Sequence, residues 1–252
     1  MSGVASEVVG DFAGRSGGAL VVGGSGGLGA AIAAMLADRG SAVAVTYRTR
    51  RPDGDHPAYA LDLGDDAAGA AVVEQAVADL GGLHTLVYAA GPHVPMRHLS
   101  AVEPGAMTAQ LAADAAGFFS VAQPALVHLR DSAGSIVAVT TAATSRFPVR
   151  DGLSAAPKAA VEAIARGLAA EEGRFGVRVN CVGPGMLTDG MAERLISSGE
   201  LDDAALAVTR RNIPLRRFGD ATDIAEAVCF LASDRAGFIS GQKLDVDGGY
   251  GV

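Results

Sequence analysis

Short apolar runs alternate along the chain with longer segments of helical periodicity. The run 19–22 ends in glycines, and the apolar positions after it recur every three to four residues until Gly40. We predict six or seven strands alternating with helices; the clearest strands lie at 19–22, 42–46, 85–89, 136–140, 177–182 and 243–246. This alternation is typical of an α/β fold: a doubly wound parallel sheet with helices on both faces and a ligand crevice at the carboxyl ends of the strands.

A second clear helix is predicted over 104–129. Its apolar positions fall on one stripe, which we interpret as core rather than as a cofactor-binding surface. The stripe consists of Met107, Leu111, Ala115, Phe118, Phe119, Ala122, Leu126 and Leu129. No linker, repeat or low-complexity segment interrupts the chain, so we expect one domain over 1–252.

Composition narrows the possible partners. The chain has 252 residues, of which 49% are hydrophobic and 19% charged, which excludes disorder and suits one large domain. Its formal net charge of −8 disfavours binding to nucleic acid or to an anionic membrane. The stretch 16–37 carries no charge, but seven of its residues are glycine, so we predict no membrane span.

The cysteines and the N-terminus indicate the compartment. Cys181 and Cys229 form neither a disulfide framework nor a zinc-binding spacing, and we interpret both as core residues in a reducing compartment. The first fifteen residues hold no basic start followed by an apolar block, so we expect no secretory signal and a cytoplasmic location. No metal site is expected.

The glycine-rich turn after the first strand is the first chemical signal. Gly23, Gly27 and Gly29 have a GxxxGxG spacing between a predicted strand and a predicted helix. In this context one glycine permits the tight turn, another lets a pyrophosphate approach the backbone, and a third lets helix and strand pack closely. The turn therefore predicts a dinucleotide site, with an ordinary turn as the alternative.

The residues after the second strand indicate which nicotinamide cofactor the chain would bind. An acidic residue there suits the ribose 2′-hydroxyl of NAD, whereas arginine suits the 2′-phosphate of NADP. This chain has Arg48, Arg50 and Arg51 at that place and no carboxylate. We therefore predict NADP(H) in preference to NAD(H), with a solvated basic loop as the alternative.

Further motifs make the sequence resemble the short-chain dehydrogenase/reductase family over nearly its whole length. They are Asp62 in Leu-Asp-Leu, Ala89-Ala90-Gly91, Pro184-Gly185 and the closing section from Ile213 to Gly249. The resemblance implies a single-domain Rossmann-type fold with a 1–17 N-terminal extension and a substrate lid at 186–212, assembled as a homotetramer or homodimer. The cofactor contacts that it implies are Gly23, Ser25, Gly27, Leu28, Gly29, Arg48, Asp62, Leu63, Ala90, Gly91, Lys158, Pro184, Gly185 and Thr188.

The catalytic positions depart from the family's pattern. The family carries a serine, a tyrosine, a lysine four residues after the tyrosine, and an asparagine on the preceding long helix. Lys158 matches the lysine, but Ser154 stands at the tyrosine position, Thr141 at the serine position and Asp114 at the asparagine position. A family variant with six residues between tyrosine and lysine would need a tyrosine at 151, where this chain has Asp151.

The missing tyrosine matters because carbonyl reduction leaves an alkoxide that must be protonated. A phenol has a pKa of about 10, which a nearby ammonium lowers, whereas a serine hydroxyl is a much weaker acid. We expect Ser154 to orient a water or a substrate oxygen, or to serve only as a helix N-cap with Pro157 in the first turn. Lys158 is expected to hold the nicotinamide ribose or to deliver a proton, with a solvated lysine as the alternative.

Asp114 has two interpretations. A carboxylate buried in a long helix is costly unless paired, so we favour a pair with Lys158. The alternative is that burial raises its pKa and makes Asp114 a proton donor. His93, in the loop after Gly91, is another candidate donor, although an exposed loop histidine is the simpler interpretation.

The remaining candidates lie near the catalytic positions. Thr141 keeps a hydroxyl near the expected substrate carbonyl, and Thr140 is a possible substitute for it. Arg146, Arg150 and Asp151 precede Ser154, and we favour a surface ion-pair cluster over contacts to an anionic substrate.

Three hypotheses for function follow. We favour an NADPH-linked reductase of a carbonyl or ketone, with a proton from Lys158, Asp114, His93 or ordered water. The apolar residues of the 186–212 lid suggest a small-molecule substrate that is apolar or acyl-like. The alternatives are a catalytically inactive dinucleotide-binding regulator or partner subunit, and a non-redox lyase, hydratase or isomerase in the same crevice.

Overall fold

The computed structural model describes residues 10–91, 94–188 and 203–252. Within them one sheet of seven parallel strands has the order β3-β2-β1-β4-β5-β6-β7. The strands are β1 (Gly18–Val22), β2 (Ala42–Tyr47), β3 (Ala58–Ala60), β4 (Leu83–Tyr88), β5 (Ser135–Val139), β6 (Arg178–Pro184) and β7 (Lys243–Val246). The predicted doubly wound α/β fold is therefore confirmed.

The strand order reverses beside β1. The chain runs outward from β1 to β3 and then returns to place β4 on the other side of β1. In open parallel sheets, ligands bind outside the carboxyl ends of the strands at such a switch point. The sheet order therefore indicates a ligand site at the turns that follow β1 and β4.

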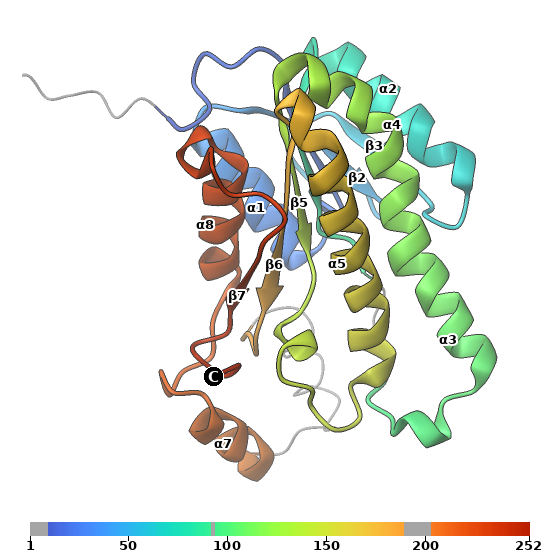
Figure 1. Cartoon of the computed structure of the whole chain (residues 1–252), viewed down its shortest axis with the longest axis vertical. Coiled ribbons are helices and arrows are strands. Elements are labelled where there is room, and N and C mark those ends of the chain that lie inside the picture. The colour runs from blue at the N-terminus through green and yellow to red at the C-terminus, as the bar shows by residue number, and fades with distance from the viewer. Residues whose placement is uncertain (1–9, 92–93, 189–202) are drawn as a thin grey trace, which may run out of the picture.

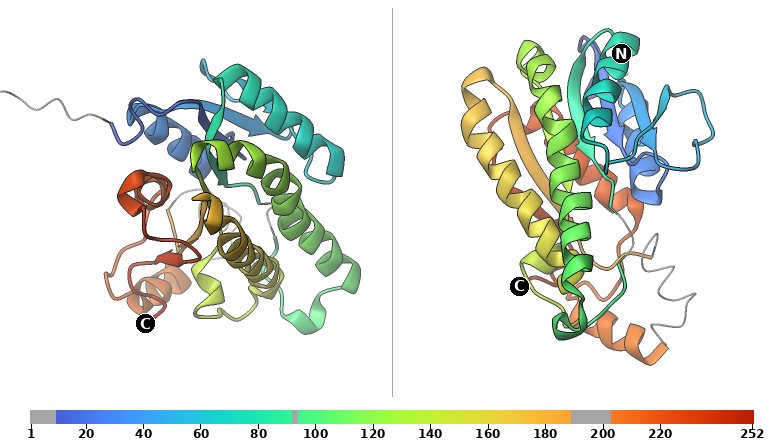
Figure 2. Two further views of the ribbon diagram at one scale, coloured as in Figure 1. Left: turned by 45° about the horizontal axis from the view of Figure 1, so that its top comes forward. Right: turned by 90° about the vertical axis from the view of Figure 1, so that its right-hand side faces the viewer.

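Helices cover both faces of the sheet (Figures 1 and 2). One face packs against α2, α4 and α5 around a core that includes Leu86, Phe118 and Val161. The other packs against α1 and α8 around a core that includes Ile32 and Ile224. The longer helices are α1 (Gly27–Asp38), α2 (Asp66–Leu80), α3 (Pro104–Leu111), α4 (Gly117–Ser132), α5 (Gly152–Glu172), α7 (Asp203–Asn212) and α8 (Ala221–Ala232). Short helical turns are η1 (Leu99–Ala101), η3 (Ala142–Thr144), η4 (Gly173–Phe175) and η5 (Asp234–Ala236).

Local signals set several helix ends. The Asp65 carboxylate accepts a hydrogen bond from the Ala67 N–H at the start of α2, which ends at Gly81 in the left-handed region (φ 70°). Helix α8 begins with a capping box between Asp220 and Asp223.

The predicted helix 104–129 differs from the observed one in an informative way. It runs as α3, one π-helical segment η2 (Ala112–Ala116) and α4. Leu111 and Phe119 are exposed, so the predicted apolar stripe is not wholly core. A strict 3.6-residue period does not continue across a π-bulge, which shifts the face that later residues present. Only the part of the stripe on α4 is buried in the sheet-facing core, and Phe119 lies off it.

The predicted strands are present, and β3 is the one that the sequence did not localise. It has three residues, none of them buried, at the edge of the sheet. A strand of three residues is shorter than the runs of four to eight residues from which strands are predicted.

Part of the predicted 1–17 N-terminal extension packs into the domain. Within the predicted 1–17 extension, Phe12 is buried and stacks on His84 with ring centroids 5.7 Å apart. Cys181 and Cys229 are buried as expected. His93 and residues 189–202 of the predicted lid lie outside the described residues. None of the described helices is both long and apolar enough to span a membrane.

Candidate functional site

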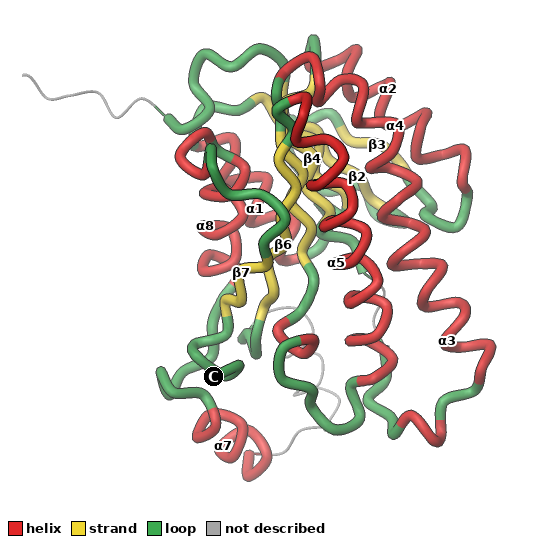
Figure 3. The backbone as a smooth tube through the Cα atoms, in the orientation of Figure 1, coloured by secondary structure: helices red, strands yellow, loops and turns green. Residues whose placement is uncertain are grey.

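The candidate site lies at the carboxyl end of the sheet, where the loops after the strands gather (Figure 3). The turn after β1 carries the glycine motif. Gly23 has a φ of 87°, and a Cβ there would lie 2.8 Å from Cα of Ala90. A Cβ at Gly29 would overlap the carbonyl oxygen of Gly23. These two glycines are therefore required by the close packing of turn, strand and helix.

Gly27 has a different environment. A Cβ added to it would meet nothing within 4 Å, and Ser25, Gly26 and Gly27 are exposed. No side chain caps the N-terminus of α1, which begins at Gly27. Free N–H groups at a helix N-terminus, with room for close approach, fit the phosphates of a dinucleotide.

The loop after β2 flanks this turn. The N–H of Gly23 donates to Thr46 Oγ1 of β2 over 3.0 Å, which joins the two segments. Arg48, Arg50 and Arg51 are all exposed. Arg50 lies 3.9 Å from Asp53, whereas Arg48 forms no ion pair with any described residue. The Arg48 guanidinium is thus available for an anion.

The other expected cofactor residues form turns. Asp62 accepts a hydrogen bond from the Gly64 N–H over 3.0 Å, and Leu63 packs against the core. The N–H of Gly185, next to Pro184, donates to the carbonyl oxygen of Val246. The Thr188 hydroxyl donates to the carbonyl oxygen of Gly219 over 3.3 Å. Leu28, with Gly29, begins the first turn of α1.

Lys158 and Asp114 form a buried ion pair. Lys158 Nζ lies 2.7 Å from Asp114 Oδ1, and their side chains are 12% and 2% exposed. Gln110 Nε2 donates to Asp114 Oδ2 over 2.8 Å, and Lys158 Nζ donates to the carbonyl oxygen of Ala90 over 3.3 Å. A Cβ at Gly91 would lie 3.1 Å from Lys158 Nζ. The favoured interpretation of Asp114, a pair with Lys158, is what the structure contains.

The π-helical segment η2 holds Asp114 in place. Tyr88, at the end of β4, donates its hydroxyl toward the carbonyl oxygens of Ala113 (3.2 Å) and Asp114 (3.3 Å). Its ring lies 5.8 Å from Lys158 Nζ. Burial raises the pKa of the Tyr88 phenol above its ordinary value, so this tyrosine is unsuited to replace the missing acid. π-Bulges of this kind occur often at functional sites.

The prediction that Ser154 caps a helix is wrong. Helix α5 begins at Gly152, and the N–H groups of Ser154 and Ala155 donate to the carbonyl oxygen of Asp151. Asp151 is therefore the N-cap residue, Ser154 lies inside the first turn, and Pro157 lies in the helix interior. Backbone hydrogen bonds one turn earlier than the sequence pattern indicated account for the difference.

The two threonines after β5 have different environments. Thr141 Oγ1 accepts a hydrogen bond from the Ala143 N–H over 3.1 Å and so caps η3, while the Thr141 side chain stays partly exposed. Thr140 is buried and donates to the carbonyl oxygen of Val182. Thr140 is therefore not a substitute for Thr141.

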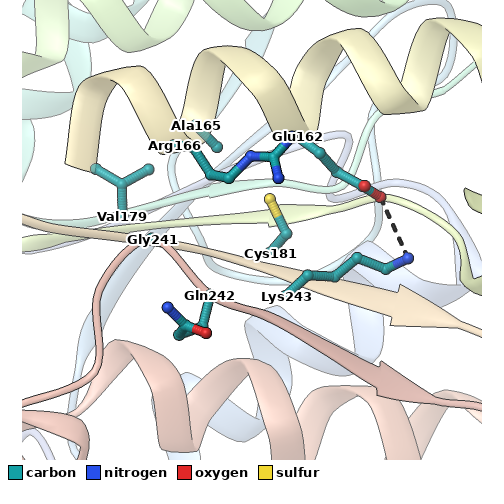
Figure 4. Close-up of a pocket in the computed structure, with 8 residues that line it drawn as sticks. All are labelled: Glu162, Ala165, Arg166, Val179, Cys181, Gly241, Gln242 and Lys243. Atoms are coloured by element: carbon teal, nitrogen blue, oxygen red, sulfur yellow. Dashed lines mark ion pairs between the residues drawn. The ribbon is translucent and has the colours of Figure 1, made fainter. Parts of the chain in front are cut away.

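A polar network behind η3 fixes the position of Thr141. The Thr144 hydroxyl contacts the Thr141 carbonyl oxygen (3.2 Å) and Glu162 Oε1 (2.8 Å). Lys243 Nζ contacts Thr144 and lies 3.5 Å from Glu162 and 3.0 Å from Asp245. Figure 4 shows Lys243 reaching from β7 toward Glu162 on α5, across a small pocket next to Cys181. This network connects β7 and α5 to the turn that carries Thr141.

The predicted ion-pair cluster before Ser154 is not formed. Arg146 stacks on Tyr250 at 4.5 Å, and Arg150 donates to the carbonyl oxygen of Met96 over 3.0 Å. Neither arginine pairs with Asp151 or with another acidic side chain in the described part of the chain. Their partners are instead the carbonyl oxygens of Tyr250 and Met96 and the Tyr250 ring.

Sequence reasoning missed two residues of the site. Gln110 lies four positions before Asp114, a helical spacing that could have suggested their hydrogen bond. Tyr88 lies at the end of an apolar strand, and nothing in its sequence context distinguishes it from a core residue. Among the described residues, no group of His, Cys, Asp and Glu could hold a metal ion.

Comparisons with known proteins match the chain over almost its whole length. The family profile described as Enoyl-(Acyl carrier protein) reductase matches residues 22–251. The chain is 34% identical over 249 residues to 4-formylbenzenesulfonate dehydrogenase of Comamonas testosteroni, covering 93% of this chain and 97% of the relative. It is 32% identical to 3-oxoacyl-(acyl-carrier-protein) reductase of Staphylococcus aureus, covering 92% and 96%.

A solved structure extends the agreement to three dimensions. A short-chain dehydrogenase from Burkholderia cenocepacia J2315, in complex with NADP, superimposes with a TM-score of 0.83 at 30% identity, covering 94% of this chain and 99% of the other. The sheet order, the glycine turn and these matches lead to one conclusion: the chain belongs to the short-chain dehydrogenase/reductase family of oxidoreductases.

Proposed function

We propose that this protein is an NADPH-linked reductase of a carbonyl or ketone that obtains its proton from a group other than a tyrosine. The observation that carries the proposal is the placement of Lys158 Nζ, 3.3 Å from the carbonyl oxygen of Ala90 in the turn after β4 and 2.7 Å from Asp114. This turn packs against Gly23 in the dinucleotide turn. Lys158 thus lies between the expected cofactor site and the catalytic positions.

The preference for NADPH rests on Arg48. Its guanidinium is exposed and unpaired among the described residues, at the strand end where an anionic 2′-phosphate would lie. The Burkholderia cenocepacia relative was solved with NADP. A bidentate guanidinium–phosphate contact would distinguish NADPH from NADH.

The reduced nicotinamide would supply the hydride when bound. Residues of this chain hold the cofactor and orient the substrate. Lys158 holds the ribose, and its ammonium keeps the site positive where the alkoxide develops. Thr141 follows β5, and its hydroxyl oxygen accepts a hydrogen bond from the Ala143 N–H at the start of η3. This hydroxyl orients the carbonyl oxygen of the substrate. Ser154, one turn before Lys158, holds the substrate oxygen or a water beside it.

Asp114 acts as a partner of Lys158 and not as the acid. Its two oxygens face an ammonium and an amide N–H, a set of donors that stabilises the carboxylate. The negative charge of Asp114 in turn holds the Lys158 ammonium in place, which is the role of a positioning residue.

The substrate class follows from the relatives and the lid. The names of these relatives describe enzymes that act on 4-formylbenzenesulfonate or on a 3-oxoacyl-(acyl-carrier protein). With Ser154 in place of a phenol the site has more room, which suits a bulky apolar or acyl-like carbonyl compound. A homotetramer or homodimer in the cytoplasm remains our expectation.

The first test is calorimetric titration with NADPH and NADH. We expect NADPH to bind more tightly than NADH, and Arg48→Ala to weaken NADPH binding about 10- to 100-fold, because a charge-assisted hydrogen bond contributes about 1.5–3 kcal/mol. Binding of NADH should change little. Arg174→Ala, an exposed arginine in η4, is the control and should leave both affinities unchanged.

Two outcomes would favour the alternative functions. Tight NADPH binding without oxidation of NADPH by any ketone or aldehyde would favour an inactive dinucleotide-binding subunit. No binding of either nucleotide would contradict the reductase and move the choice to non-redox chemistry in the same crevice.

A further inference from the structure

The chain has only two lysines, Lys158 and Lys243, and its other permanently charged basic side chains are arginines. Both lysines are mostly shielded from solvent and form ion pairs. Lys158 lies in the candidate site, and the other lysine pairs with Glu162 and Asp245. We propose that Lys243 is a positioning residue, which holds the turn that carries Thr141 at a fixed place relative to Lys158. The inference rests on the proposed carbonyl reduction.

The Lys243 side chain reaches from β7 to the turn η3 across Gly183 of β6. Lys243 and Asp245 are two positions apart on β7, so their side chains leave the same face of the sheet. Their neighbours on β6 are Cys181 and Gly183. A Cβ at Gly183 would overlap Asp245 Oδ1 and lie 2.6 Å from Lys243 Cε. It would also lie 3.2 Å from the backbone nitrogen of Ala142 in η3. The absence of a side chain at Gly183 therefore gives the residues of β7 room to contact η3.

The Lys243 ammonium meets oxygen atoms from three segments. It donates to Thr144 Oγ1 and, over 3.0 Å, to Ser145 Oγ, which lie in and next to η3. It lies 3.0 Å from Asp245 Oδ1 of its own strand and 3.5 Å from Glu162 Oε1 of α5. Ser145 Oγ in turn donates to Asp245 Oδ2 over 2.5 Å. One cation therefore joins β7, α5 and η3, and it offsets the repulsion between two carboxylates.

Thr144 connects this cluster to Thr141. The Thr144 hydroxyl lies 3.2 Å from the carbonyl oxygen of Thr141 and 2.8 Å from Glu162 Oε1. Thr141 Oγ1 accepts a hydrogen bond from the Ala143 N–H at the start of the same turn. The backbone and the hydroxyl of Thr141 are thus both bonded within η3, so this hydroxyl moves only with the turn as a whole.

Helix α5 relates the turn to Lys158. Glu162 lies four residues after Lys158, so the two side chains leave α5 one turn apart. Figure 4 shows Glu162 extending from α5 toward Lys243. A shift of η3 by about 1 Å would move the Thr141 hydroxyl away from a substrate oxygen beside Lys158, and a misplacement of that size can slow a reaction about 10²-fold. The relative placement of the two catalytic positions therefore depends on Lys243.

The first test is a double-mutant cycle of Lys243→Ala and Thr141→Val. The probes are aliphatic, aromatic and thioester-linked ketones, with NADPH at saturation. We expect Lys243→Ala to lower kcat about 10- to 100-fold, while KM and the Kd for NADPH stay close to wild type. Thr141→Val should lower kcat about 10²-fold. Because Lys243 acts through Thr141, adding Lys243→Ala to Thr141→Val should lower kcat little further.

A cavity beside Lys243 permits chemical rescue. Its volume is about 170 Å³, and Glu162, Arg166 and Lys243 are among its lining residues (Figure 4). In Lys243→Ala this cavity is larger, and we expect ethylammonium to enter it and recover most of the lost kcat. Tetramethylammonium, which has the same charge but no N–H donor, should recover none. The control is Arg166→Ala, which removes an exposed cation of the same cavity and should keep the kcat of wild type.

The position of the turn also has a measurement that needs no substrate. In spectra of protein labelled with carbon-13 at the threonine methyl groups, the Thr141 signal is the one missing from Thr141→Val. This signal should shift in Lys243→Ala, return with ethylammonium and stay in place in Arg166→Ala. If Lys243→Ala does not fold, Lys243→Met, which keeps most of the side-chain volume without the charge, takes its place in the kinetics and the spectra.

These measurements separate the role of Lys243 from the proposed function. With an active wild type, an unchanged kcat in Lys243→Ala would overturn the role of Lys243. An equal loss of kcat with Thr141 present and with Thr141→Val would overturn it as well, because the effect would not act through Thr141. An unshifted Thr141 signal would contradict the hold of Lys243 on η3. A wild type that reduces no carbonyl compound would overturn the proposed function, and the Thr141 signal would still decide whether Lys243 positions the turn.

Discussion

The carboxylate of Asp114 is 2% exposed and has an ammonium at one oxygen and an amide at the other. A neutral asparagine at this position could not neutralise a lysine. Taking two charges out of water is costly, and the pair is retained only because each charge meets a close partner. At the scale of single residues, Asp114 therefore gives Lys158 a charged partner where the family pattern has a neutral asparagine.

Substitution of Asp114 tests this pair. We expect Asp114→Ala to lower the free energy of unfolding by about 3 kcal/mol, because Lys158 is left buried without a counter-charge and Gln110 loses its acceptor. Asp114→Asn keeps an acceptor and should cost less, about 1 kcal/mol. Urea denaturation measures both. Equal losses for the two variants would show that the charge contributes nothing.

At the scale of elements, the glycine turn and helix α1 separate folding from binding. The same motif contains Gly29, which packs on the turn, and Gly27, which faces open space. The GxxxGxG spacing does not distinguish these two glycines, whereas the structure shows that their surroundings differ. Helix packing requires Gly29, and we propose that Gly27 lets a phosphate of the cofactor approach the backbone.

A pair of alanine substitutions separates these roles. Gly29→Ala should destabilise the protein by about 1–3 kcal/mol, because its Cβ meets the Gly23 carbonyl oxygen and the backbone must move. Gly27→Ala should leave the melting temperature unchanged or slightly raised, since alanine favours a helix. Its affinity for NADPH should nevertheless fall.

Differential scanning calorimetry and NADPH titration of the two variants provide the measurements. Full NADPH affinity in Gly27→Ala would contradict the placement of a phosphate at the N-terminus of α1. Wild-type stability in Gly29→Ala would contradict the close packing of this helix on the turn.

At the scale of the whole molecule, residues 10–17, before β1, pack against the rest of the domain. Phe12 stacks on His84, and its N–H donates to the carbonyl oxygen of Arg39. Arg39 also pairs with Asp11 over 3.3 Å and with Glu226 over 2.5 Å. One arginine thus joins the N-terminal segment, the end of α1 and helix α8 on one face of the sheet.

Removal of the Phe12 ring should therefore affect global stability. Phe12→Ala should lower the free energy of unfolding by about 3–4 kcal/mol, the usual cost of deleting a buried aromatic side chain. Phe12→Leu should lose less because most of the apolar volume remains. Guanidinium denaturation checks the order, and a stability equal to wild type in Phe12→Ala would contradict the packing.

Much of the fold was predictable because its signals are local. Strand β4 ends in the apolar run Leu86-Val87-Tyr88, and the turn at Gly23 directly follows a strand, so the apolar runs and the glycines identified both. Thr140 and Ser154 were misjudged because their roles depend on backbone hydrogen bonds to Val182 and Asp151. The pattern of residues along the chain does not reveal such hydrogen bonds.

The sequence by itself determined the alternation of strands and helices, the glycine turn and the absence of a tyrosine between Thr141 and Lys158. These features depend on residue type and spacing, and neighbours along the chain suffice to interpret them. Only the tertiary structure decided that Asp114 meets Lys158, 44 positions away, and that Asp151 rather than Ser154 is the N-cap residue of α5. Burial and the approach of distant charges arise when the sheet brings separate segments together, so neighbours along the chain do not reveal them.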